Sequence, residues 1–236
     1  MSSIIFFSDT HLNISEPSKT QRVINFLHKQ KPKTVFYILG DFFDLWIGPK
    51  HLELEDYREI ITELKSLTVK GYQINFIPGN RDFQLGPEIT AAAGVNVLPE
   101  IVNLNLDSNK VLLTHGDIFC TEDKSYQSYR RVSRSRIVKN LYQSLPQNLG
   151  LKLGRGVRNY SKEVVPRKGA AGRNLIESVL MRYFKRGRDT IICGHVHNSQ
   201  IREIGPGKIL MTVGSWERQG SYIEYDKGQF TLKNED

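Results

Sequence analysis

Five apolar stretches of the 236-residue chain are each followed at once by side chains that can bind metal ions. These side chains form five groups: Asp9 and His11; Asp41 and Asp44; Asn80; His115 and Asp117; His195 and His197. Four of the six histidines belong to them, so most of the histidine in the chain sits at such positions. Aspartate, histidine and asparagine offer oxygen and nitrogen ligands without thiolate, a set that suits Mn²⁺, iron or Zn²⁺ better than Ca²⁺ or an iron–sulfur cluster. The pattern predicts a transition-metal site.

Seven of these side chains are candidate metal ligands: Asp9, His11, Asp41, Asn80, His115, His195 and His197. Seven ligands are too many for one ion, whereas two ions that share one carboxylate would use them all, and Asp41 is the natural bridge. Two ions about 3.5–4 Å apart activate a water molecule and stabilise the charge of an in-line phosphoryl displacement. Any one of the motifs alone is more typical of capping or surface residues in a loop. All five, in order and each after an apolar strand, indicate phosphoryl chemistry at a two-metal site.

The elements that must position these ligands alternate between strands and helices. Apolar runs predict strands at 4–7, 34–39, 74–77, 110–114 and 189–193, and helical spacing predicts helices at 18–30, 52–69, 174–184 and between Pro87 and Gly94. Three more strands are expected at 209–213, 221–225 and 229–232. In α/β sheets, ligands bind beyond the carboxyl ends of the strands, where short loops meet on a rigid base. We therefore expect a layered α/β protein with mixed sheets.

The charge of the chain is unevenly distributed along the sequence. The segment from Lys124 to Arg188 holds 17 Lys or Arg against two acidic residues, a net +15, so with a total of +8 the rest carries −7. Such asymmetry indicates contact with an anionic partner, namely nucleic acid, a phosphorylated substrate or a membrane surface; a solvated basic face is the alternative. The segment reads as short helices broken by Pro146 and several glycines. We interpret residues 122–188, approximately, as a basic helical cap inserted into a single domain that spans 1–236.

Compartment signals in the sequence point to a cytoplasmic protein. No apolar run is long enough to span a bilayer, and no basic segment followed by an apolar one precedes the first predicted strand. Cys120 and Cys193 are far apart and form no CxxC pair, which fits a reducing compartment and two small buried side chains.

The series SDTH, GDFFD, GNRD, THGD and GHVH resembles the motifs of the calcineurin-like metallophosphoesterases over almost the whole chain. The resemblance implies a four-layer αββα sandwich of two mixed β-sheets and a two-metal site. Carried over residue by residue, one ion would be held by Asp9, His11, Asp41 and His197. The other would be held by Asp41, Asn80, His115 and His195, with Asp41 bridging.

Arg81 departs from the pattern of that family, most members of which have histidine after the asparagine as a proton donor to an alcohol leaving group. An arginine stays charged and is no general acid near neutral pH, although it can bind phosphate with two parallel hydrogen bonds. Proton donation matters most when the leaving oxygen is strongly basic, and a phosphate leaving group is much less basic. Arg81 therefore favours a diphosphate substrate over a simple phosphomonoester or a nucleic-acid strand.

The same departure occurs in one branch, the UDP-2,3-diacylglucosamine pyrophosphatases (hydrolases) of lipid A biosynthesis, which this chain also resembles in ILGDFFDLWIG, GNRDFQLG, HGDIFCTEDKSYQSYR, RNYSKE and GSWERQGSY. The branch implies hydrolysis of UDP-2,3-diacylglucosamine to 2,3-diacylglucosamine 1-phosphate (lipid X) and UMP, with water activated by two Mn²⁺ ions attacking the α-phosphorus. It implies catalytic roles for Asn80, Arg81 and His195. Substrate contacts would be Asn80, Arg81, Asp123, Tyr126, Ser161, Lys168 and His195. A usual asparagine of the branch is Val165 here, so this chain departs from the branch at one position that the resemblance implies as a polar contact to the sugar.

Apolar and basic residues interleave in the predicted cap, at Leu141, Leu145, Leu149, Leu151 and Leu153 among Lys139, Lys152, Arg155 and Arg158. Such a surface suits acyl chains and phosphates, and it also suits peripheral contact with the anionic cytoplasmic face of the inner membrane. Packing of these leucines against the body is the alternative. We expect no nucleic-acid or protein partner, but a nuclease or another nucleotide or nucleotide-sugar phosphoesterase is the competing enzyme hypothesis. A scaffold that has lost its chemistry is a third hypothesis, which the intact ligand set argues against.

Overall fold

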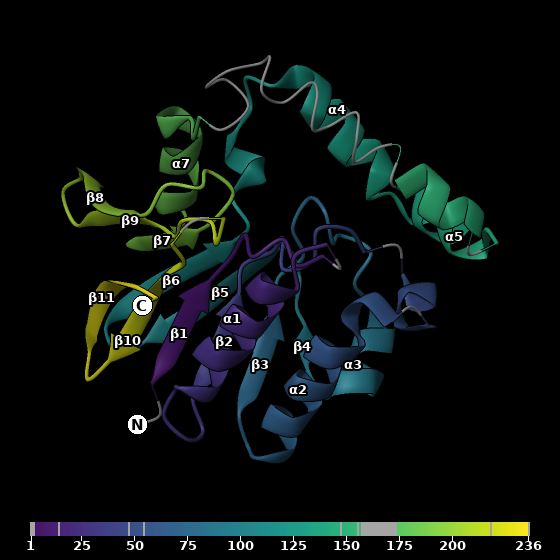
Figure 1. Ribbon diagram of the computed structural model, residues 1–236. Coiled ribbons are helices and arrows are strands. Elements are labelled where there is room, and N and C mark those ends of the chain that lie inside the picture. Colours follow the sequence, from purple (N-terminus) through teal and green to yellow (C-terminus); the bar gives the residue numbers. More distant parts are fainter. Residues whose placement is uncertain are drawn as a thin grey trace.

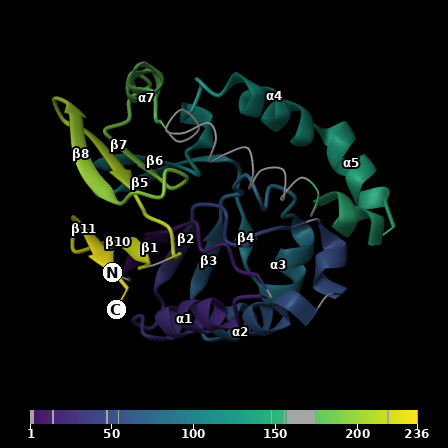
Figure 2. The same ribbon diagram turned by 45° about the horizontal axis from the view of Figure 1, so that its top comes forward.

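A computed structural model describes residues 3–13, 15–46, 48–53, 55–146, 148–154, 156, 174–217 and 219–235. Two β-sheets pack face to face between layers of helices, and an arm of two helices runs outside this sandwich (Figure 1). Seen from above, α1, α2 and α3 cover one sheet and α7 lies beyond the other, with the arm above both (Figure 2). The expected four-layer αββα arrangement is confirmed.

The first sheet carries three of the predicted site loops. Its central strands β1 (Ile4–Phe7), β2 (Val35–Ile38) and β3 (Gln73–Phe76) run parallel, followed at one edge by the short β4 (Asn96–Val97). At the other edge, β10 (Ser221–Asp226) pairs antiparallel with β1, and β11 (Gln229–Asn234) pairs with β10. The sheet is mixed, in the order β11-β10-β1-β2-β3-β4.

The second sheet carries the other two site loops. Its strands β6 (Asn109–Thr114), β7 (Thr190–Cys193) and β9 (Lys208–Thr212) are parallel. The antiparallel strands β5 (Ile101–Leu106) and β8 (Gln200–Gly205) form its two edges, in the order β5-β6-β7-β9-β8.

The helices of the sandwich are α1 (Pro17–His28), α2 (Arg58–Val69), α3 (Pro87–Ala93) and α7 (Glu177–Phe184). The arm consists of α4 (Lys124–Ser133) and α5 (Arg136–Ser144), and residues 148–154 are also helical. The arm lies within the expected cap, whose bounds at 122 and 188 stay a prediction. None of the helices in the described ranges is both long and apolar enough to cross a membrane.

Three apolar clusters separate the four layers. Side chains alternate across a strand, so Ile5 and Phe7 of β1 pack toward α1 and α2, while Phe6 between them packs toward the second sheet. The third cluster joins the outer face of the second sheet to α7 through Leu180 and Phe184. Strands buried on both faces read as continuous apolar runs, which explains why the central strands are evident in the sequence.

The structure corrects two sequence expectations. The helix expected at 52–69 begins only at Arg58, because 3₁₀ turns occupy Pro49–Glu53 and Glu55–Tyr57. Tyr57 lies at the N-cap with its ring buried against Phe43, at 4.7 Å between ring centroids. The helix expected at 174–184 likewise begins later, at Glu177.

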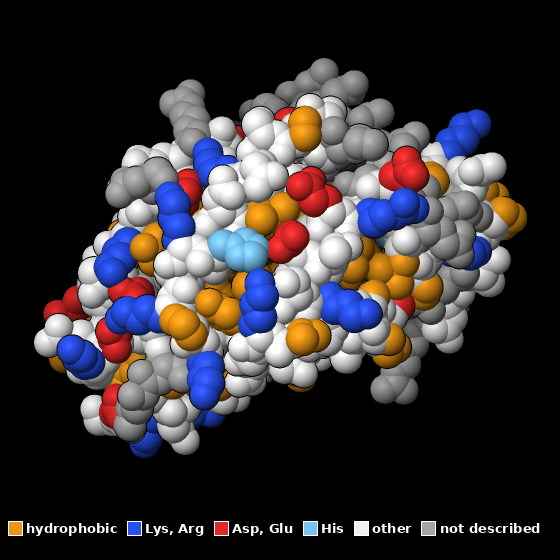
Figure 3. Space-filling view, turned by 60° about the horizontal axis from the view of Figure 1, so that its bottom comes forward, with side chains coloured by type: hydrophobic (Ala, Val, Ile, Leu, Met, Phe, Trp, Pro, Cys, Tyr) orange, Lys and Arg blue, Asp and Glu red, His pale blue; other side chains and the backbone are white. Residues whose placement is uncertain are grey.

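On the face opposite the arm, side chains of both charges are interspersed with hydrophobic ones (Figure 3). No single sign dominates this view, in contrast to the basic composition of the segment that contains the arm.

Candidate metal centre

Loops at the carboxyl ends of five parallel strands bring the predicted ligands together. The loops after β1, β2 and β3 of the first sheet supply Asp9, His11, Asp41 and Asn80, and those after β6 and β7 of the second sheet supply His115, His195 and His197. The two sheets pack against each other, so their strand ends share one edge of the sandwich. Backbone hydrogen bonds lock the first two loops together: the amides of Asp9 and His11 donate to the carbonyls of Gly40 and Asp41 at 3.1 and 3.0 Å.

Five of the seven candidate ligands have left-handed backbone conformations. The φ angles are 55° at Asp9, 48° at His11, 54° at Asp41, 69° at His195 and 58° at His197. Positive φ is uncommon outside glycine, and such strained residues concentrate at functional sites. The surrounding structure therefore holds these side chains in place at the expense of local backbone energy.

The first group of ligands surrounds Asp9. Its Oδ1 lies 3.5 Å from Nε2 of His11 and 3.3 Å from Nε2 of His197. Its other oxygen, Oδ2, accepts hydrogen bonds from the Ser8 hydroxyl and from the amide of His195, the latter at 2.8 Å. Asp9 is thus anchored through one oxygen, and the other faces two histidines.

The second group of ligands surrounds Asn80. Its Oδ1 lies 2.9 Å from Nε2 of His115 and 3.1 Å from Nδ1 of His195. The Nδ1 of His115 is 2.8 Å from the carbonyl of Leu39, to which it must donate because a carbonyl only accepts. In neutral His115 this leaves Nε2 unprotonated, as a metal ligand requires.

Asp41 lies between the two groups. Its Oδ2 is 3.4 Å from Nε2 of His11, and its Oδ1 is 3.7 Å from Nε2 of His115. Burial opposes ionisation of Asp41, but His115, His11 and Arg81 outweigh it and hold the pKa of this carboxyl below its ordinary value. Asp41 is therefore a buried anion with one oxygen toward each group.

These residues fit a cation chemically. Within the described part of the chain, Asp9 Oδ1, both ring nitrogens of His11 and Nε2 of His195 are buried without a hydrogen-bond partner. An unsatisfied buried polar atom costs about 1–3 kcal/mol. Two sets of ligand atoms lie within 4.8 Å of one another: Asp9, His11 and His197; and Asp9, Asp41 and His115. A divalent cation would satisfy both the orphaned atoms and the buried negative charge.

Asp82 organises the loops without being one of the predicted ligands. Its carboxylate accepts backbone hydrogen bonds from Gly79 at 2.7 Å, Phe42 at 2.8 Å and Asp41 at 3.2 Å. Burial and the nearby Asp41 raise the pKa of Asp82 to about 6, against the opposing effect of these amides. The carboxylate in GNRD thus ties the β3 loop to the β2 loop.

Gly79 permits the closest approach between these two loops. A Cβ atom at this position would lie 2.2 Å from Asp41 Oδ1 and 2.3 Å from the Asp41 amide. Any side chain here would therefore collide with Asp41, and it is this close approach, not the φ angle, that requires glycine.

Arg81 lies beside the predicted metal ligands, and its guanidinium points at two carboxylates. Its Nε is 3.4 Å from Asp41 Oδ2, and an Nη forms an ion pair with Asp44. Its backbone amide separately donates to Asp41 Oδ1 at 2.9 Å. Asp44, the last residue of GDFFD, therefore orients the Arg81 side chain.

The predicted substrate contacts are only partly within the described residues. Asp123 caps α4, accepting from the amide of Tyr126 at 3.0 Å. The ring of Tyr126 stacks on His195, at 6.2 Å between centroids and 28° between planes. Ser161, Lys168 and Val165 lie outside the described residues, so their positions stay predictions. The two tryptophans of the chain, Trp46 and Trp216, are core residues at 1% and 0% exposure.

A buried charge cluster behind the site was not anticipated from the sequence. Asp117 accepts hydrogen bonds from Tyr126, Arg130 and Arg134, and both arginines also pair with Glu100. Burial opposes ionisation of Asp117, but Arg134, His115 and Arg130 hold its pKa below the ordinary range. The i, i+4 spacing of Arg130 and Arg134 indicates that the two side chains share one face of a helix. It does not indicate their partners, Asp117 and Glu100, which come from other segments of the chain.

Comparisons with known proteins agree with the geometry. Residues 2–199 match the family model described as calcineurin-like phosphoesterase. A UDP-2,3-diacylglucosamine hydrolase of Sodalis glossinidius is 35% identical over 227 residues, 94% of this chain and 93% of the relative. One of Histophilus somni is 30% identical over 235 residues, 98% of this chain and 99% of the relative. The solved structure of an archaeal phosphodiesterase superposes with a TM-score of 0.52 at 15% identity, covering 98% and 99% of the two chains, a likeness of fold alone.

Proposed function

Because the chain belongs to the calcineurin-like phosphoesterase family, we propose that it hydrolyses UDP-2,3-diacylglucosamine to UMP and 2,3-diacylglucosamine 1-phosphate (lipid X) in lipid A biosynthesis. The observation that carries the proposal is the similarity to relatives named UDP-2,3-diacylglucosamine hydrolase over at least 93% of both chains. The position of Arg81 beside the metal ligands supports it, since the arginine is what favours a diphosphate substrate.

We assign two Mn²⁺ ions to the centre. One would be held by Asp9, His11, Asp41 and His197, and the other by Asp41, Asn80, His115 and His195. The opposed oxygens of Asp41 support the bridging role. Bound there, the two ions would polarise the phosphate as Lewis acids and lower the pKa of water.

The residues of the chain itself account for binding and for departure of the leaving group. Arg81, oriented by Asp44, presents charged donors to the diphosphate. Asn80 precedes Arg81 in the chain, and its Oδ1 lies 3.1 Å from Nδ1 of His195. Water attack on the α-phosphorus breaks the bond to the bridging oxygen, which leaves as part of a sugar phosphate. This leaving group is an anion of low basicity, so no proton donor is needed where Arg81 stands. Asp123, Tyr126, Ser161 and Lys168 are the further proposed contacts.

Hydrolysis of two matched substrates tests this function. With Mn²⁺ and detergent, the protein is expected to release UMP from UDP-2,3-diacylglucosamine and much more slowly from UDP-glucosamine without acyl chains, because only the first can use an apolar surface. The released UMP is measured by chromatography. Two parallel samples are run, one containing a chelator and one supplied with Mg²⁺. Equal rates on both would instead indicate a general nucleotide-sugar pyrophosphatase. No UMP from either, together with Mn²⁺-dependent cleavage of single- or double-stranded DNA, would replace the proposal by the nuclease hypothesis.

We further propose that the arm rests on the cytoplasmic face of the inner membrane. Ile137 is 80% and Leu141 63% exposed, and their i, i+4 spacing places them on one face of α5. Val132, Leu149 and Leu153 are also exposed, so packing against the body does not account for these side chains. Apolar burial combined with a basic composition suits an anionic lipid surface.

Vesicle binding tests the membrane proposal. The double variant Ile137→Glu/Leu141→Glu is expected to bind phosphatidylglycerol-containing vesicles at least about 10-fold more weakly, because burial of each side chain contributes about 1.5–3 kcal/mol. Val69→Glu is the matched control, since Val69 is also 80% exposed but ends α2, a helix of the sandwich. Co-sedimentation measures binding. Wild-type protein that stays in the supernatant, or equal weakening by the control, would contradict the contact.

A further inference from the structure

Helix α4 is attached to the sandwich by charge rather than by an apolar face. Only Ser133 of α4 is buried; instead, Arg130 of the helix and Arg134 at its C-cap both bind Asp117. Arg130 donates through Nε to Asp117 Oδ2 at 2.8 Å, and Arg134 donates through an Nη to the same oxygen at 3.1 Å. Each arginine also pairs with a different oxygen of Glu100. The two arginines therefore form nearly equivalent braces between the same two carboxylates.

Only one of the two braces reaches the metal centre. The Nη of Arg134 that binds Asp117 also donates to the carbonyl of Gly79, at 2.8 Å. That carbonyl belongs to the peptide bond between Gly79 and Asn80. Arg130, by comparison, binds Asp117 and Glu100, and within the described part of the chain it forms no hydrogen bond to this loop.

The loop around Asn80 is consequently fixed on three sides. Asp82 accepts from the Gly79 amide, Asp41 accepts from the Arg81 amide, and Arg134 binds the Gly79 carbonyl. The first two anchors come from the site loops themselves. Arg134 is the anchor that comes from the helical arm.

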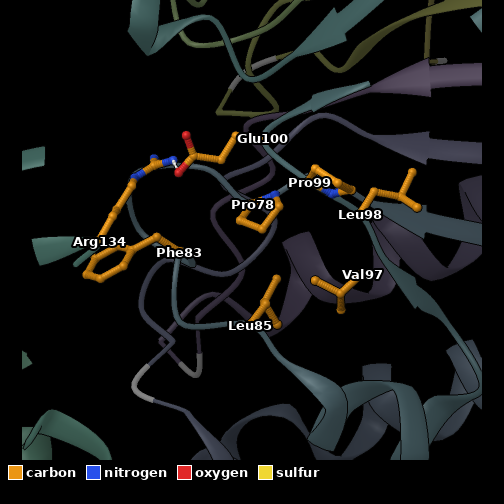
Figure 4. Close-up of a pocket in the computed structure, with 8 residues that line it drawn as sticks. All are labelled: Pro78, Phe83, Leu85, Val97, Leu98, Pro99, Glu100 and Arg134. Carbon is orange, nitrogen blue, oxygen red and sulfur yellow. Dashed lines mark hydrogen bonds and ion pairs between the residues drawn. The ribbon is translucent and has the colours of Figure 1, made fainter. Parts of the chain in front are cut away.

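Packing alone does not hold the Arg134 side chain. A cavity of about 290 Å³ lies against it, lined by Pro78, Phe83, Leu85, Val97, Leu98, Pro99, Glu100 and Arg134 (Figure 4). The guanidinium lies 6.0 Å from the centre of the Phe83 ring, and the figure shows it directed at Glu100. Its position is therefore set by its hydrogen bonds and ion pairs, and it would change if those were altered.

A second connection runs from the same carboxylate to the other side of the centre. The Tyr126 hydroxyl donates to Asp117 Oδ2 at 2.6 Å, and the Tyr126 ring stacks on His195. Asp117 thus links α4 to His195 through Tyr126 and to Asn80 through Arg134. Both of these ligands are assigned to the same ion.

We propose that Arg134 is a positioning residue for the metal centre, which couples the docking of α4 to the placement of Asn80. The inference rests on the proposed two-metal function, because Asn80 is assigned there as a ligand. Residues outside the ligand set that orient ligands change metal affinity or activity by about 10- to 100-fold when altered. The guanidinium suits this role, since its planar fork binds Glu100, Asp117 and Gly79 at once, whereas a lysine ammonium is a single point of charge.

The matched variants Arg134→Lys and Arg130→Lys test the proposal. Both keep the charge beside Asp117, so both should fold, which circular dichroism and thermal unfolding check. Titration calorimetry with MnCl₂ is expected to show one ion bound about 10- to 100-fold more weakly by Arg134→Lys and nearly unchanged binding by Arg130→Lys. Amide hydrogen exchange of residues 79–81 in metal-free protein should be faster in Arg134→Lys only. The pair Arg134→Met and Arg130→Met repeats the comparison should a lysine variant misfold.

Unchanged binding of both ions by Arg134→Lys, or equal weakening by Arg130→Lys, would overturn the proposal, since the cluster would then only dock the arm. These readouts do not depend on turnover. Wild-type protein that binds Mn²⁺ but releases no UMP would therefore contradict the proposed function. The role of Arg134 would still be decided by the Mn²⁺ titration of its variants.

Discussion

Replacement of Asp41 by asparagine is expected to reduce UMP release at least about 1,000-fold, since losing a single donor to a developing charge already costs about 100- to 1,000-fold. The two carboxylate oxygens of Asp41 face His11 and His115 separately. Asparagine keeps the shape but offers one oxygen and one NH₂ group, and it removes the negative charge. The NH₂ group would then face either His11 or His115, and it is a hydrogen-bond donor at a position where a bridging ligand must be an acceptor. The variant should therefore also lose bound Mn²⁺.

Metal content measured by mass spectrometry and UMP release measured on the same sample check this result together. Asp226→Asn is the control, because Asp226 is a carboxylate paired with Lys31 at the end of β10, remote from the site loops. It should retain both metal and activity. Full metal content and full activity of Asp41→Asn would refute the assignment of Asp41 as the bridging ligand.

The layers of the fold and the ligand cluster were predictable from the sequence for one physical reason. The central strands are buried on both faces, so they appear as apolar runs such as Ile4–Phe7, and the ligands follow immediately where these runs end. The edge strands β5 and β8 were not predicted, because each has one face turned outward and reads as polar alternation. Burial therefore determined which central strands could be found, while the exposed edge strand β11 was predicted from its hairpin pattern with β10.

Contacts between distant charged residues could not be predicted in the same way. Asp117, Glu100 and Arg134 are separated in sequence, and nothing in the sequence pairs Asp117, which stands in the same motif as His115, with the other two. Only the fold shows Asp117 at 1% exposure between two arginines of α4. The positive φ angles of five ligands are likewise a consequence of loop packing, with no signal in residue type. What escapes sequence reasoning is thus the support of the site rather than the clustering of its candidate ligands.

Arg81→Ala is expected to lower UMP release by about 100- to 1,000-fold while both Mn²⁺ ions stay bound. The side chain presents charged donors for the diphosphate, so its removal weakens stabilisation of the charge that develops on the phosphate. The metal ligands lose little, because the hydrogen bond from Arg81 to Asp41 Oδ1 comes from the backbone amide and survives the substitution. Arg81→Lys should recover only part of the activity, since an ammonium does not bind phosphate with two parallel hydrogen bonds.

Three quantities measured together separate this role from a structural one: metal content, kcat and KM. The control is Arg58→Ala, which removes an arginine paired only at the exposed start of α2 and should change none of them. Asp44→Asn should behave as a weaker version of Arg81→Ala, since the Asp44 carboxylate pairs with the guanidinium and orients it. Loss of Mn²⁺ from Arg81→Ala would mean that the guanidinium supports the metal centre through its contact with Asp41. Retained metal with slow turnover would instead assign it to the diphosphate, which is the feature that separates this site from one built to cleave simple phosphomonoesters.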